Sequence, residues 1–121
     1  MKTKKIRIGF KDIGTALDAF VETGEALIRG EEVREEAGVY FTNIEAFRKA
    51  VTPRRLELLN VIKKARPGSI NELASVAHRD IKNVAEDIRL LAQMGLLDLN
   101  EVQNRMAPEV DYDEIDVRIA V

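Results

Sequence analysis

Residues 69–95 read SINELASVAHRDIKNVAEDIRLLAQMG, and this stretch decides the fold. Asn71 is expected to cap a short helix over residues 72–77, because an Asn side chain can accept from the free N–H groups of a first turn. After a two-residue link, Asp80 suits the N-cap of a longer helix that ends near Gly95. The stretch therefore predicts two helices joined by a tight turn.

The segments on either side extend this pattern. Thr52 and Pro53 are typical of an N-cap and a first helical residue, because a proline there lacks only an N–H that would be unpaired anyway. After Gly95 the apolar period changes from helical to alternating, which predicts a hairpin with a polar tip at residues 103–105. The order over residues 52–110 is helix, short helix, tight turn, longer helix and hairpin, the order of a winged helix-turn-helix.

The longer helix carries an apolar stripe that fixes which side chains face outward. If the stripe is buried, Lys82 and Asn83 must point to solvent, and the first turn can enter a DNA major groove about 12 Å wide. Lys82 would then reach phosphate or guanine, and Asn83 would pair with adenine. The stripe and its expected neighbours on the two preceding helices are Ile81, Val84, Ile88 and Leu91 with Leu56, Leu59, Leu73 and Val76.

The ends of the chain show other periods. Residues 5–10 and 38–41 are expected to be strands, and residues 13–28 carry the stripe of an amphipathic helix. Residues 115–121 alternate as a final strand, which would pair with residues 6–10 either within one chain or across two. Four residues of the helical stripe form either a cover for the core or a dimerisation face, namely Leu17, Phe20, Gly24 and Leu27.

The predicted fold class is α+β, mainly α, in three parts. Residues 1–42 form an N-terminal strand-helix extension that serves dimerisation, residues 43–110 form the winged helix-turn-helix, and residues 111–121 form an acidic C-terminal strand. A dimer is expected because one winged helix buries too little surface for tight DNA binding, and dimers read half-sites about 34 Å apart.

The charge distribution favours a nucleic-acid partner for the middle of the chain. The 121 residues have a net charge of −2, but between Ala46 and Met106 eleven basic residues outnumber seven acidic ones. Cysteine is absent, which excludes disulfides and thiolate sites. We find no catalytic motif, and we expect a cytoplasmic non-enzyme without cofactor, metal or membrane segment.

The sequence also resembles a known family. The helix-turn-helix core of the MarR and ArsR superfamilies of prokaryotic regulators is similar to SINELA (69–74), NVAEDIRLL (83–91) and GLL (95–97). A narrower group of short archaeal and bacterial MarR-like regulators is similar to YF (40–41), LELL (56–59), DIKNV (80–84) and YDEI (112–115). The resemblance covers about residues 39–121 and implies a transcriptional repressor, or an antitoxin encoded beside a toxin. The long flanking helices of MarR proteins are missing, so their dimer and effector sites are not carried over.

The sequence-based hypothesis is a homodimeric repressor of its own neighbourhood that binds double-stranded DNA. Lys82 and Asn83 read bases, while phosphates are held by Arg79, Arg89 and Arg105, with Arg54 and Arg55 as further contacts or plain surface. The acids Glu86 and Asp87 would repel phosphate unless they pair with Arg89 or Arg79 or accept from a cytosine amino group, and pairing is favoured. His78 is interpreted as a turn residue. Two alternatives stay open: an antitoxin that contacts a cognate toxin, and a winged-helix interaction module that does not bind DNA.

Overall fold

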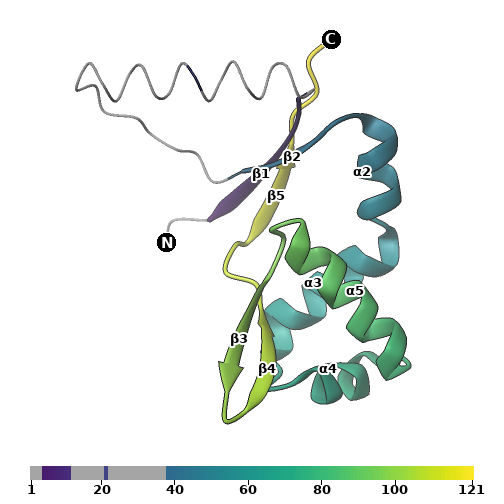
Figure 1. Ribbon diagram of the computed structural model, residues 1–121, viewed down its shortest axis with the longest axis vertical. Helices are drawn as coiled ribbons and strands as arrows, with labels where there is room; N and C mark the ends of the chain where they lie inside the picture. The colour runs from purple at the N-terminus through teal and green to yellow at the C-terminus, as the bar shows by residue number, and fades with distance from the viewer. Residues whose placement is uncertain (1–3, 12–20, 22–37) are drawn as a thin grey trace, which may run out of the picture. The chain divides into compact units, whose positions relative to one another are not determined.

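Strand β1 (Lys5–Phe10) is the central strand of a sheet in the computed structural model, which describes residues 4–11, 21 and 38–121. Strands β2 (Gly38–Phe41) and β5 (Glu114–Val117) both pair with it in parallel, in the order β2-β1-β5 (Figure 1). Both terminal strands were predicted, and here they pair within one chain. β5 is shorter than predicted, because it ends at Val117 and not at the end of the chain.

The sheet belongs to one of two units into which the chain divides. The first unit comprises Met1–Phe47 and Asp113–Val121, and the second comprises Arg48–Tyr112. The two terminal segments thus fall into one unit, whereas the sequence had suggested separate parts. The predicted amphipathic helix and the proposed dimerisation residues Leu17, Phe20, Gly24 and Leu27 lie outside the described residues.

Helix α2 (Ile44–Ala50) follows β2 directly. Asn43 caps it, since the Asn43 Oδ1 accepts from the Ala46 N–H at 2.8 Å. The ring of Phe47 meets the rings of Phe10 and Phe41 edge to face, with centroids 5.8 and 5.6 Å away. This aromatic cluster holds the start of α2 against the ends of β1 and β2.

The second unit contains three helices and a hairpin (Figure 1). These are α3 (Pro53–Ala65), α4 (Ile70–Ala77), α5 (Ile81–Gln93), and the antiparallel strands β3 (Asp98–Val102) and β4 (Arg105–Glu109). The prediction of an α+β fold is confirmed. No helix among the described residues is both long enough and apolar enough to span a bilayer.

The predicted start of α4 was wrong by two residues. Ser69, not Asn71, is the N-cap, and its hydroxyl accepts from the Glu72 N–H at 3.1 Å. The Glu72 carboxylate reaches back to the Gly68 N–H at 2.9 Å. Ser69 and Glu72 have the spacing of a capping box, a stronger signal than a lone Asn.

The core of the second unit differs from the predicted stripe at three positions. Val84, Ile88, Leu91, Leu59 and Leu73 are buried as predicted. The predictions for Leu56, Val76 and Ile81 were wrong, because their side chains are 43, 45 and 43% exposed.

Helix geometry explains two of these errors, and position along the helix explains the third. On α3 the buried residues are Leu58, Leu59 and Ile62, and at 100° per residue Leu56 points well away from that arc. Val76 lies at a similar angle from the buried face of α4. Ile81 is the first residue of α5, about 4.5 Å along the axis before the first buried residue, Val84.

Tyr112 closes this core where the chain leaves the second unit. Its side chain is buried, and its hydroxyl donates to the Leu96 carbonyl oxygen at 2.6 Å. Burial, and after it the negative charge of Asp111, raises the pKa of Tyr112 to about 12. The folded state therefore favours the neutral phenol.

We predict that replacing Tyr112 by Phe lowers the free energy of unfolding by about 1–2 kcal/mol, because the buried Leu96 carbonyl is left without its donor. The raised pKa also predicts an alkaline transition. The stabilisation from the neutral phenol is complete below pH 10 and is lost as the pH rises from about 10 to 12. Urea unfolding at pH 7, 10 and 11.5 checks both effects, and an equal alkaline loss in Tyr112→Phe would exclude Tyr112 as its source.

Candidate functional site

The first turn of α5 presents two polar side chains to solvent. Both Lys82 and Asn83 are exposed, while Val84 next to them is buried. The predicted cap is confirmed, because the Asp80 Oδ2 accepts from the backbone N–H groups of Lys82 and Asn83 at 3.2 and 3.4 Å. Since the Asp80 carboxylate already occupies this helix end, recognition of an anion here has to come from side chains.

Asp87, one turn further along α5, is held by two arginines. Its Oδ2 accepts from Arg79 Nη2 at 2.8 Å, and its Oδ1 accepts from Arg55 Nε at 3.1 Å. The three side chains are only 15–22% exposed. Asp87 therefore links α5 to the turn before it and to the first turn of α3.

Arg55 extends this link to the end of α2. Its Nη1 donates to the carbonyl oxygens of Lys49 and Ala50, at 3.1 and 2.8 Å. These two carbonyls belong to the last turn of α2, where backbone oxygens lack helical partners. One guanidinium thus joins three helices.

These ion pairs bear on the predicted roles of two residues. Arg79 was predicted to bind phosphate or to pair with an acid, and Arg55 to bind phosphate or to be a plain surface residue; in the structure both form ion pairs with Asp87. The prediction that an acid on this turn pairs with Arg79 is confirmed, and the second partner is Arg55 rather than Arg89. Glu86 remains exposed on the outer face of α5.

The other predicted phosphate-binding residues lie at the surface. Arg54, Arg89 and Arg105 are all exposed. Arg105 is the first residue of β4, directly after the two-residue hairpin turn at Gln103 and Asn104. Both turn residues have positive φ, 51° and 64°, which is the geometry of a type I′ turn. Arg105 is therefore displayed at the tip of a tight hairpin.

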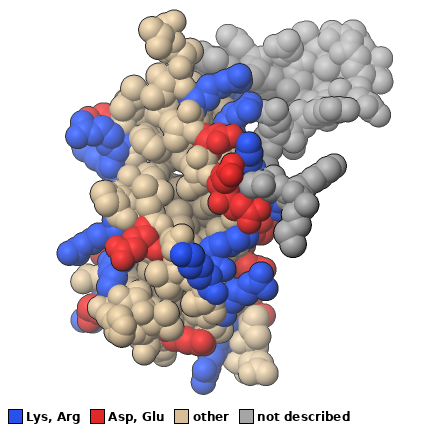
Figure 2. Space-filling view, turned by 180° about the vertical axis from the view of Figure 1, so that it is seen from behind, with Lys and Arg blue, Asp and Glu red and all other residues tan. Residues whose placement is uncertain are grey.

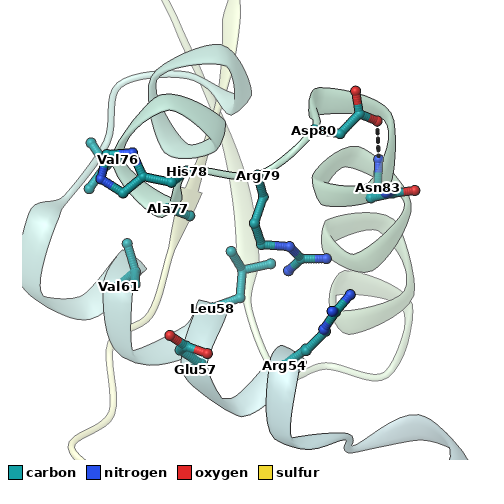
Figure 3. Close-up of a pocket in the computed structure, with 10 residues that line it drawn as sticks. All are labelled: Arg54, Glu57, Leu58, Val61, Val76, Ala77, His78, Arg79, Asp80 and Asn83. Atoms are coloured by element: carbon teal, nitrogen blue, oxygen red, sulfur yellow. Dashed lines mark hydrogen bonds between the residues drawn. The ribbon is translucent and has the colours of Figure 1, made fainter.

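A cleft of about 480 Å³ separates the first half of α3 from the turn and the start of α5 (Figure 3). Arg54 and Asn83 line it from opposite sides, and Arg79 also reaches into it. The Arg79 Nη1 atom is buried and has no hydrogen-bond partner among the described residues, whereas its Nη2 atom donates to Asp87. The exposed apolar side chain of Val76 lines the same cleft. Sequence reasoning missed this cleft because it counted Val76 as core.

His78 occupies the turn between α4 and α5, as predicted. It has a left-handed backbone conformation with φ 55°, and its N–H donates to the Ser75 carbonyl at 3.2 Å. Glycine often takes such a position because other residues are strained there. The exposed His78 side chain lies at the edge of the cleft. Its backbone sets the sharp angle between the two helices.

Basic and acidic side chains alternate over short distances on the face shown in Figure 2. Residues 48–112 hold eleven basic and nine acidic residues, a net charge of +2. This unit therefore has individual placed cations but no strong overall positive field.

Comparison with known proteins adds one finding. The family model described as HVO_A0114 matches residues 50–117, which is more than half of the chain. No curated protein and no solved structure matches the chain.

The Asp87 ion pairs generate a stability prediction. Replacing Asp87 by Ala leaves two largely buried guanidinium groups without a counter-charge, and we expect the free energy of unfolding to fall by about 3 kcal/mol. Glu86→Ala is the matched control, because it removes an exposed acid from the neighbouring position and should change stability by less than about 0.5 kcal/mol. Urea denaturation compares the two, and equal small effects would show that the ion pairs contribute little.

Proposed function

The chain belongs to the HVO_A0114 family, and from the geometry of residues 48–112 we propose that it binds double-stranded DNA as a winged helix-turn-helix protein. In this proposal α4 and α5 are the helix-turn-helix, and the β3-β4 hairpin is the wing. The element order and the two-residue wing turn support the assignment.

One observation carries the proposal. Val84, Ile88 and Leu91 are buried on one side of α5, and this burial turns Lys82 and Asn83 to solvent at the start of the helix. The start of the second helix is the part that enters the major groove in helix-turn-helix proteins. A long cation and an amide at this point have the chemistry to read guanine or phosphate and adenine.

The proposed DNA-binding residues follow from exposure. Asn83 reads a base, Lys82 reaches phosphate or guanine, and Arg54, Arg89 and Arg105 bind phosphates. Arg55 and Arg79 are left out because Asp87 holds them. The same ion pairs neutralise Asp87, so that Glu86 is the one acid on this part of α5 left to meet DNA; its carboxylate can accept from a cytosine amino group.

We further propose that the protein acts as a homodimer and represses its own neighbourhood. A single unit of this size offers about four cations to the phosphates, which supports weak binding only. A twofold pair doubles the number of cations and reads two half-sites. The proposed role is that of a binding protein and not of an enzyme.

We predict a steep salt dependence for DNA binding. Four cations in each protomer neutralise up to about eight phosphates in a dimer, and the slope of log K against log salt should reach about −7.

Lys82→Ala should weaken binding to every sequence and reduce the magnitude of this slope by about one for each phosphate that is no longer neutralised. Asn83→Ala should cost about 1–3 kcal/mol at one base position. Selection from a random duplex library, followed by fluorescence anisotropy at several salt concentrations, measures these effects.

Lys64→Ala is the matched control. Lys64 is an exposed cation in the last turn of α3, and its removal should leave DNA affinity unchanged. If Lys82→Ala and Asn83→Ala bind DNA as well as the unmodified protein does, another surface reads the DNA. If no duplex is enriched at any salt concentration, the proposed function is wrong.

A further inference from the structure

A second cleft lies entirely within the unit that contains the parallel sheet. Its volume is about 740 Å³. We call it the carboxyl-end cleft, because most of its lining follows the carboxyl ends of the three strands: Lys11 after β1, Asn43, Ile44 and Glu45 after β2, and Arg118, Ile119 and Ala120 after β5. In parallel sheets this edge is where ligands commonly bind.

Gly9 and Tyr40 shape the floor of this cleft. A Cβ atom at Gly9 would lie 3.0 Å from Tyr40 Cε1, so the absence of a side chain lets the Tyr40 ring lie across the sheet. The outer side of this ring faces Lys11, whose Nζ lies 4.2 Å from the ring centroid. The cation–π contact holds the Lys11 ammonium at the cleft.

Cations outnumber acids in the lining. Arg7, Lys11 and Arg118 contribute three positive charges, and Glu45 contributes one negative charge. The Arg118 backbone N–H donates to the Ile8 carbonyl at 2.9 Å, which fixes this residue one position after β5. The Arg118 side chain is exposed, and we find no ion pair for it in the part of the chain that the structure describes. A planar guanidinium in this position can bind an oxyanion through two parallel hydrogen bonds.

Asn43 adds a neutral donor to these cations. Its amide oxygen already accepts from the Ala46 N–H, so its amide nitrogen is the group left to donate to a ligand. The cleft thus brings donors and positive charge to the carboxyl end of a parallel sheet, beside an apolar lining from Phe10, Ile44, Ile119 and Ala120. The cations fit an oxyanion, and the apolar side chains fit the rest of the molecule that carries it.

We propose that the carboxyl-end cleft binds a phosphate group through Lys11 and Arg118, with Tyr40 as the residue that positions Lys11. The phosphate comes either from a phosphorylated small molecule or from a DNA backbone. The site differs in residues and in unit from the DNA-reading surface proposed above, so either can exist without the other.

Isothermal titration calorimetry of the full chain with sodium pyrophosphate tests whether the cleft binds a phosphorylated small molecule. The ionic strength is kept constant with chloride. We expect a dissociation constant below about 1 mM. Lys11→Gln and Arg118→Gln should each weaken binding at least fivefold. Tyr40→Ala should have the same effect, whereas Tyr40→Phe should retain binding because it keeps the aromatic face.

Lys5→Gln is the matched control. Lys5 is an exposed cation at the amino end of the same strand, outside the cleft, and its removal should not change pyrophosphate binding. Circular dichroism of every variant confirms that the fold is retained. Pyrophosphate binding that survives in the Lys11, Arg118 and Tyr40→Ala variants would overturn the proposal.

DNA-binding measurements on the same variants test whether the phosphate belongs to a DNA backbone. If pyrophosphate does not bind, but Lys11→Gln and Arg118→Gln lower DNA affinity and Lys5→Gln does not, the phosphate belongs to DNA. If neither pyrophosphate nor DNA responds to these variants, the proposal is wrong. If the protein binds no DNA at all, the proposed function is wrong, but the pyrophosphate titration still tests whether the carboxyl-end cleft binds phosphate.

Discussion

The ion pairs of Asp87 with Arg55 and Arg79 are the interaction on which the arrangement of the second unit depends. They join α5, the turn and α3, and Arg55 continues to the last carbonyls of α2. Charges that are largely removed from water stay favourable only while each has its partner. The same geometry divides the five arginines that the sequence placed at the DNA surface, since Arg55 and Arg79 are held by Asp87, whereas Arg54, Arg89 and Arg105 are exposed.

This division shows why the sequence predicted the helices better than the site. The caps at Thr52 and Asp80 and the buried face at Val84, Ile88 and Leu91 are local patterns, and the structure has them as predicted. Arg55 and Asp87 are 32 residues apart, and no spacing rule along a helix joins them. The charge of Asp87 therefore predicted an arginine beside it, but no local pattern identified Arg55 as its second partner.

The errors within helices have a related cause. Helix α3 has apolar residues on several sides, so the sequence predicted Leu56 in the core. In the structure Leu58 is buried and Leu56 is exposed. Only packing against the other helices selects one stripe among several apolar choices. The exposed Val76 had the same ambiguity, and it lines the cleft between α3 and α5, which no local pattern in the sequence indicates.

The sheet follows from pairings even more distant in sequence. At the amino end of the sheet the Lys4 N–H donates to the Asp113 carboxylate, and these two residues are 109 positions apart in the sequence. The entropy cost of closing a chain rises with the length of the flexible segment, so this pairing is most favourable once residues 48–112 have folded and no longer behave as a flexible loop. Folding of the core around α5 thus lowers the entropy cost of pairing β5 with β1. Because Arg118 follows β5 directly, the cations of the carboxyl-end cleft come together only when that pairing is complete.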